Sequence, residues 1–134
     1  MTIVVQRCSE AKVTINNEII SQIESGLMLL VGINKGDEFF DADKVVDKII
    51  HLRIFNDEKD KMNLSVLDIN GSVMVVSQFT LCGDTRKGRR PSFINAENPE
   101  KGLEIYDHMV NRLRAVSYTH LRAHETEADL VCRL

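Results

Sequence analysis

The feature that most constrains the fold is an uninterrupted apolar run, Leu27-Met28-Leu29-Leu30-Val31, which Gly26 introduces. Five consecutive apolar residues leave no polar face, so a strand made from them must be covered on both sides. A half-buried strand would instead alternate polar and apolar residues. The run therefore predicts a central strand in a layered α/β domain, and a length of 134 residues fits one such domain.

Shorter patterns predict the elements around this strand. Residues 3–5 begin an earlier strand, and Asn16-Asn17 predicts a hairpin between residues 12–15 and 18–20, because asparagine tolerates the positive φ of a tight turn. Asn70-Gly71 predicts a second hairpin, between residues 65–69 and 72–78.

Two stretches have apolar residues at helical spacing and predict amphipathic helices. One covers residues 42–50. The other is capped by Asn98 and starts at Pro99. Its predicted apolar face consists of Leu103, Tyr106, Met109, Val110 and Leu113.

Composition excludes several classes of protein. The net charge of −3 rules out a basic surface all round, so any contact with nucleic acid must be local. No apolar run is long enough to span a bilayer, and no secretory signal is readable. Three cysteines (Cys8, Cys82 and Cys132) without a C-x-x-C pair fit a reducing compartment, so we expect a cytoplasmic protein without a membrane partner. His120 and His124 have no third ligand at a convincing spacing, so no metal is expected.

The most informative stretch for function follows the apolar residues 73–76. There Ser77-Gln78-Phe79-Thr80-Leu81 leads into a loop with four cations in five residues: Arg86, Lys87, Arg89 and Arg90. Fixed hydrogen-bond donors at a strand end, beside positive charge, suit an ester that carries phosphate groups.

Each part of this stretch also has a structural interpretation. Ser77 and Thr80 can be ordinary strand residues, and no His or Asp lies nearby in the sequence to activate them, so a serine-hydrolase triad is unsupported. The cations can be a solvated charge run. Phe79 and Phe93 can be core aromatics or platforms for stacked bases.

Six motifs, in order, resemble the D-aminoacyl-tRNA deacylase family over residues 1 to about 114. They are Gln6-Arg7, Gly32-x-x-Lys35-Gly36-Asp37, Leu52-Arg53-Ile54-Phe55, Lys61-Met62-Asn63-Leu64-Ser65, the Ser77–Leu81 stretch, and Asp84-Thr85-Arg86-Lys87-Gly88-Arg89-Arg90-Pro91-Ser92-Phe93.

The resemblance implies a single α/β domain with a mixed and antiparallel, barrel-like sheet and two amphipathic helices. It also implies hydrolysis of the ester in D-aminoacyl-tRNA, and of glycyl-tRNA mischarged on tRNA-Ala, as translation proofreading. The implied enzyme is a homodimer that needs no cofactor and binds tRNA but not DNA.

The resemblance also assigns roles to residues. Ser77, Gln78, Phe79 and Thr80 form the catalytic pocket, whose backbone N–H groups near Phe79 and Thr80 hold the substrate carbonyl while the ribose hydroxyl of the RNA assists. Arg7 and Leu81 bind substrate, with Arg7 bracing the pocket and an arriving motif of the partner subunit. Phosphate contacts come from Arg86, Lys87, Arg89 and Arg90.

The resemblance stops near residue 114. Family members continue with two further strands and a Gly-Pro motif with a cis peptide, which crosses the dimer interface and enforces chirality. Here neither Pro91 nor Pro99 follows a glycine, and residues 117–126 are similar to translated sequencing-adapter read-through. We therefore expect a truncated domain at 1–114 without its C-terminal strands, a non-family tail at 115–134, and a chain that is inactive or unselective for chirality. Rival hypotheses are an RNA-binding module without catalysis and an inactive fragment.

Overall fold

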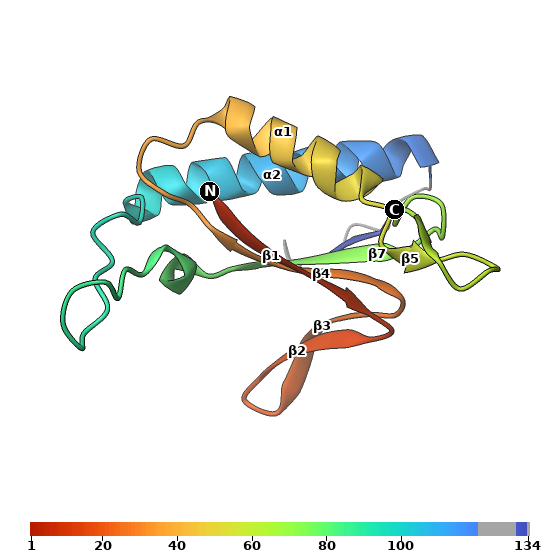
Figure 1. Ribbon diagram of the computed structural model, residues 1–134, viewed down its shortest axis with the longest axis horizontal. Coiled ribbons are helices and arrows are strands. Elements are labelled where there is room, and N and C mark those ends of the chain that lie inside the picture. Colours follow the sequence, from red (N-terminus) through yellow and green to blue (C-terminus); the bar gives the residue numbers. More distant parts are fainter. Residues whose placement is uncertain (121–130, 134) are drawn as a thin grey trace.

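The structure is a computed structural model that describes residues 1–120 and 131–133. Two helices lie on one face of a central sheet, and a hairpin lies on the other (Figure 1). The helical elements are α1 (Phe39–His51), α2 (Pro99–His120) and the 3₁₀ turn η1 (Phe79–Cys82). The strands are β1 (Thr2–Cys8), β2 (Ala11–Ile15), β3 (Glu18–Ile23), β4 (Gly26–Gly32), β5 (Phe55–Asn56), β6 (Met62–Leu64), β7 (Ser72–Ser77) and β8 (Val131–Arg133).

Strand β4 is the central strand that the apolar run predicts. The main sheet has the order β1-β4-β7-β8, and β4 runs antiparallel to β1 and parallel to β7. Leu27, Leu29 and Val31 belong to the core shared with the helices, whereas Met28 packs against the smaller cluster around Ile23 of β3. The helix-facing side of β4 is fully buried, whereas Met28 and Leu30 on the other side are half-buried, so the predicted cover is complete on one face and partial on the other.

Both predicted helices form, with two differences in detail. The side chain of Asn98 caps α2, since its Oδ1 accepts the N–H of Lys101 at 2.9 Å. Ile105 is buried on the packed face, whereas Leu103, predicted on that face, is 59% exposed. Helix α2 also continues to His120, past the boundary predicted near residue 114.

The first predicted hairpin is confirmed and the second is wrong. Asn16 and Asn17 turn between β2 and β3 with φ of 50° and 64°. Residues 65–71 instead form a compact turn, in which the N–H of Gly71 donates to Val66 O at 2.9 Å. Asn70 keeps its positive φ of 51°, so the local turn signal was correct. Strand β7 pairs with β4 instead, and its residues Val73 and Val75 are buried in the core that the sheet shares with the helices.

Against the expectation of missing C-terminal strands, residues 131–133 pair antiparallel with β7 as one short strand, β8. The predicted α/β class, with a mixed sheet and two helices, is confirmed. The main sheet is open, with β1 and β8 at its edges, and β2-β3 and β5-β6 form two separate two-stranded sheets, so the described strands do not close into a barrel. Within residues 1–120, neither helix combines the length and the apolar character needed to cross a membrane.

Candidate active site

The candidate site lies where the parallel strands β4 and β7 end. Ser77, the last residue of β7, pairs with Val31, and the N–H of Gln78 donates to Val31 O at 2.7 Å. The chain then enters η1, which carries Phe79 and Thr80. The expectation that Thr80 sits in a strand is therefore wrong, because the chain leaves the sheet after Ser77.

Gly32 lets the turn pack directly on β4. A Cβ on Gly32 would lie 3.0 Å from both Cys82 Sγ and Leu81 Cβ, and 3.1 Å from Gln78 O. The Cys82 thiol is buried and lies 3.4 Å from Ile33 O, and burial raises the pKa of this thiol. Cys82 is thus a packing residue, and Leu81 has a packing contact in the same place.

A cleft of about 440 Å³ opens beside Ser77 and Phe79. Its other walls come from the end of β4, the segment before α2 and the first turns of α2. They are lined by Val31, Ile33, Ala96, Glu97, Pro99, Gly102, Leu103 and Tyr106. The cleft is therefore largely apolar, with two hydroxyl-bearing residues and one carboxylate among those that line it.

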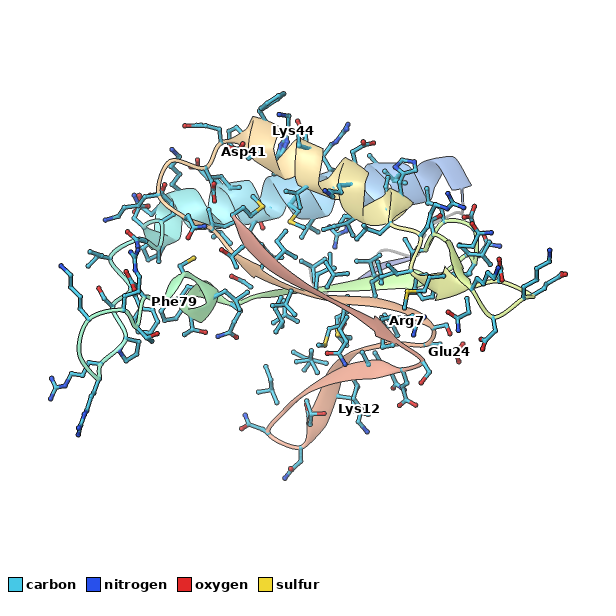
Figure 2. All side chains as sticks on the ribbon, in the orientation of Figure 1. Arg7, Lys12, Glu24, Asp41, Lys44 and Phe79 are labelled. Atoms are coloured by element: carbon cyan, nitrogen blue, oxygen red, sulfur yellow. The ribbon has the colours of Figure 1, made fainter. Side chains whose placement is uncertain are left out.

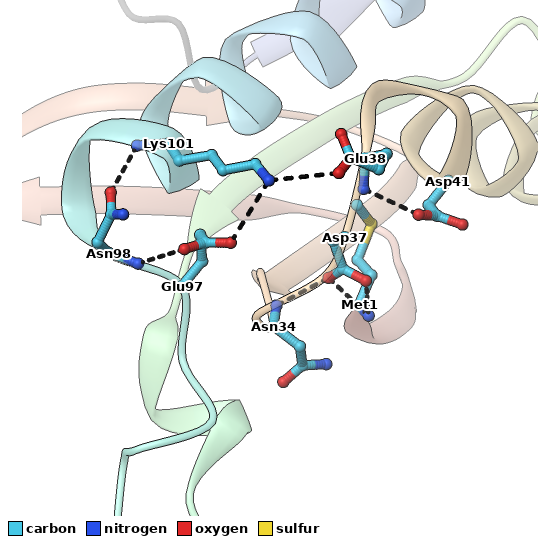
Figure 3. A network of polar contacts seen from close by, with 8 residues as sticks. All are labelled: Met1, Asn34, Asp37, Glu38, Asp41, Glu97, Asn98 and Lys101. Atoms are coloured by element: carbon cyan, nitrogen blue, oxygen red, sulfur yellow. Dashed lines mark hydrogen bonds and ion pairs between the residues drawn. The ribbon is translucent and has the colours of Figure 1, made fainter.

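The sequence did not predict Glu97 or Tyr106 as parts of this site. The hydroxyl of Tyr106 donates to Val75 O at 3.0 Å, which fixes the ring against β7. Glu97 Oε1 accepts the N–H of Asn98 at 2.9 Å, and Lys101 Nζ lies 3.9 Å from the Glu97 carboxylate and 3.4 Å from that of Glu38 (Figure 3). The only local sequence signal that could have pointed to Glu97 was the helix cap that follows it.

A second set of polar contacts in Figure 3 fixes the loop at residues 34–37, beside the segment that precedes α2. The ammonium of Met1 lies 2.7 Å from the Asp37 carboxylate, and both groups are nearly buried. The same carboxylate accepts the N–H of Asn34 at 2.7 Å. Lys35 N–H donates to Asn95 O at 2.8 Å, so this loop and the segment before α2 are joined. The cleft therefore has walls that are fixed by polar contacts.

The hydroxyl groups of the turn have no activating partner among the described residues. Gln78 Nε2 donates to Thr80 Oγ1. No hydrogen bond in the described part of the chain links Ser77 or Thr80 to a histidine or a carboxylate. The first N–H groups of a 3₁₀ turn have no acceptor inside the turn, which leaves those of Phe79 and Thr80 available to a ligand. Such paired donors can stabilise the charge that develops on a carbonyl oxygen.

The basic loop is a narrow hairpin whose two sides meet at Asp84 and Ser92. Each residue donates its N–H to the carbonyl of the other at 2.8 Å. The Asp84 carboxylate binds the guanidinium of Arg86 at 2.7 Å, and this contact lowers the pKa of Asp84 to about 2. One of the four predicted cations is thus paired within the loop, whereas the exposed Lys87, Arg89 and Arg90 lie around its tip.

The structure does not bring Arg7 to this turn within the chain. Arg7 pairs with Leu27, four residues before Val31, which corresponds to about 13 Å along the strand. Its Nη1 donates to Ile54 O at 2.7 Å and to Asn56 Oδ1 at 3.2 Å. Figure 2 shows Arg7 and Phe79 toward opposite ends of the sheet. A role for Arg7 in substrate binding stays a prediction.

The described residues contain no group of three side chains suited to hold a metal ion. His124 lies outside the described residues, so the histidine pair with His120 is not placed.

Comparison with known proteins identifies the family of the chain. A family model described as D-Tyr-tRNA(Tyr) deacylase matches residues 4–131. The chain belongs to this family. The D-aminoacyl-tRNA deacylase of Geobacillus sp. (strain WCH70) is 55% identical over 114 residues, which cover 85% of this chain and 75% of the relative. That of Syntrophus aciditrophicus (strain SB) is 54% identical over 112 residues, which cover 84% and 75%.

Two solved structures share the fold of the chain. The c-Myc DNA Unwinding Element Binding Protein is 38% identical with a TM-score of 0.82, over 87% of this chain and 78% of that one. A probable eukaryotic D-amino acid tRNA deacylase has a TM-score of 0.69 at 18% identity, over 84% and 66%. The family match runs past residue 114, whereas the two bacterial relatives align over 112–114 residues. The domain boundary near 114 stays a prediction.

Proposed function

We propose that this protein hydrolyses the ester that joins a D-amino acid to the 3′ end of tRNA. The observation that carries the proposal is its membership of the deacylase family, with relatives of that name at 54–55% identity. The geometry agrees, because the family's Ser77–Leu81 stretch forms a turn at the end of two parallel strands, beside a cleft. Ligands of open α/β sheets commonly bind at such strand ends.

In the proposed mechanism, backbone N–H groups of η1 stabilise the negative charge that develops on the ester carbonyl oxygen. The ester carbonyl oxygen accepts hydrogen bonds from the N–H groups of Phe79 and Thr80, which stabilise it as negative charge develops. Water adds to the carbonyl carbon, and the bond to the ribose oxygen breaks. The products are the free D-amino acid and a tRNA whose ribose oxygen has taken up a proton. The neighbouring ribose hydroxyl assists, since neither Ser77 nor Thr80 has an activating base among the described residues.

Further parts of the proposal concern partners and substrate range. Lys87, Arg89 and Arg90 bind tRNA phosphates, with Arg86 held by Asp84. The protein acts as a cytoplasmic homodimer in translation proofreading, and glycyl-tRNA mischarged on tRNA-Ala is a further substrate. Arg7 and Leu81 support the bound substrate.

A pair of substitutions tests the backbone mechanism. Residue 79 is the first of a 3₁₀ turn, a position where proline is commonly tolerated. Gln78 before it, with φ of −144° and ψ of 84°, lies outside the helical region that a following proline disfavours. Phe79→Pro removes the ring and the N–H, whereas Phe79→Ala removes the ring alone. We expect kcat for D-tyrosyl-tRNA to fall about 10²- to 10³-fold further in Phe79→Pro than in Phe79→Ala. Equal kcat values in two folded variants would contradict the mechanism.

A second candidate is a nucleic-acid-binding module without chemistry. It is favoured by the exposed cations of the hairpin tip and by the name of the 38% identical structure, the c-Myc DNA Unwinding Element Binding Protein. Gel retardation of tRNA by a chain that releases no D-tyrosine from D-tyrosyl-tRNA would support this candidate. A DNA competitor in the same assay tests the expectation that DNA is not a partner.

A further inference from the structure

Two aromatic rings lie exposed between the cleft and the basic hairpin. The side chains of Phe79 and Phe93 are 58% and 37% exposed, so neither is a core residue. Their ring centroids are 5.4 Å apart, and the rings meet edge to face at 68°. Ile94, which follows Phe93, is 71% exposed. Large apolar groups that stay together in water commonly mark a binding surface.

The position of each ring connects the two parts of the candidate site. Phe79 lines the cleft. Phe93 follows Ser92, which closes the hairpin, and its Cε1 would lie 3.0 Å from a Cβ on Gly83. The ring of Phe93 is therefore packed over the foot of the hairpin. Going from Ser92 back to Arg90 or Arg89 takes two or three residues, roughly 7–10 Å of extended chain.

We propose that Phe93, together with Phe79, is a stacking platform for unpaired bases at the 3′ end of the RNA, and that Lys87, Arg89 and Arg90 contact the phosphates of the same strand. This rests on the proposed function and deepens it. Proteins that hold single-stranded nucleic acid combine aromatic rings with a cationic track in this way. A base inside a duplex has both faces stacked, so the platform favours an unpaired base.

Charge favours nucleic acid over another protein surface as the occupant. Asp84 is the only acidic residue between Gly83 and Ile94, and the Arg86 guanidinium occupies its carboxylate. The exposed charge beside the rings is therefore positive, which suits a polyanion. Because every base has a π face, the platform predicts tolerance of base identity and a requirement for a single strand.

Binding of uncharged RNA tests the proposal without any ester chemistry. The probes are a fluorescently labelled single-stranded RNA of eight nucleotides and a blunt-ended RNA duplex, each measured by anisotropy. The variants are Phe93→Leu, which removes the π face, and Phe93→Tyr, which keeps it. Phe40→Leu is the matched control, since Phe40 is 63% exposed on α1 and outside the candidate site.

We expect Phe93→Leu to weaken binding of the single strand roughly 5- to 150-fold, the range of one base stacked on one ring. Phe93→Tyr and Phe40→Leu should bind within about twofold of the unmodified protein, and duplex binding should not depend on residue 93. Unchanged single-strand binding by Phe93→Leu, or equal losses on strand and duplex, would overturn the proposal. A change in self-association by sedimentation, with RNA binding unchanged, would overturn it too and make the rings an interface between copies.

The two proposals fail separately in this design. Hydrolysis of D-tyrosyl-tRNA is measured on the unmodified protein, and its absence would reject the proposed function alone. Binding of uncharged RNA needs no catalysis, so its dependence on Phe93 stays readable in either case.

Discussion

Replacing Gly32 by alanine should disturb the turn that carries the site. The added methyl group meets three atoms at 3.0–3.1 Å, and all three belong to residues 78–82. Ordinary contacts of a Cβ begin near 3.4 Å. The turn must therefore move a few tenths of an ångström away from β4, against the hydrogen bond from Gln78 N–H to Val31 O at 2.7 Å.

Such overpacking costs about 1–3 kcal/mol of unfolding free energy. For a domain of this size that corresponds to a fall in Tm of roughly 3–15 °C. Because the displaced residues hold the proposed N–H donors, kcat for D-tyrosyl-tRNA should fall as well, in protein that is still folded at the assay temperature.

Thermal unfolding followed by circular dichroism, with kcat measured on the same samples, provides the test. Gly102→Ala is the control for stability, since its nearest contact would be Glu97 Cβ at 4.0 Å and alanine favours a helix by up to about 1 kcal/mol. A Gly32→Ala variant with unchanged Tm and kcat would refute the packing of the turn on β4.

Three further predictions concern single groups of the site. Thr80→Val should keep kcat within about tenfold of the unmodified protein, because the backbone N–H groups rather than the Thr80 hydroxyl are proposed to stabilise the ester carbonyl. Loss of turnover with intact folding and RNA binding would show that the hydroxyl is essential. The double variant Arg89→Ala with Arg90→Ala should weaken tRNA binding about equally across tRNA sequences, and it should lower the slope of log affinity against log salt concentration by about 0.7 for each phosphate that is no longer neutralised. Removing the two lysines of residues 57–61 is the control and should change neither the affinity nor this slope. An unchanged slope in the double arginine variant would mean that the loop is a solvated charge run. The pKa of Asp84 in the folded protein is about 2, below its ordinary value of 3.8, so the contribution of its ion pair to hairpin stability is present above about pH 4 and is lost as the pH falls toward 2. NMR signals of the loop should shift over this pH range. Signals that do not change between pH 4 and pH 2 would contradict the ion pair.

Local sequence patterns correctly predicted the elements whose formation depends least on which other parts of the chain pack against them. The run at Leu27–Val31 has to be covered on both faces whatever covers it, and Asn98-Pro99 starts a helix through contacts within four residues. Asn70-Gly71 likewise predicted a turn, but not the partner of the strand that follows. Parallel pairing of β7 with β4 joins residues far apart in the chain, and no two-residue signal encodes it.

The candidate site divides in the same way. Residues 77–82 are contiguous, so the stretch could be recognised, although its 3₁₀ geometry depends on packing against Gly32. Glu97 and Tyr106 reach the cleft through the docking of α2 on β7, which the helical period of α2 does not specify. Arg7 was grouped with the turn through the family resemblance, yet strand register puts it about 13 Å along β4 from that end.

The most direct test of the account is single-turnover hydrolysis of D-tyrosyl-tRNA by the 134-residue chain, beside the same measurement on L-tyrosyl-tRNA. A denaturation curve and gel retardation on the same preparation establish that the protein is folded and binds tRNA. The account predicts release of D-tyrosine well above the uncatalysed rate, and the L-ester beside it shows whether the chain selects for chirality. A chain that unfolds cooperatively and retards tRNA, but leaves the D-ester intact, would contradict it.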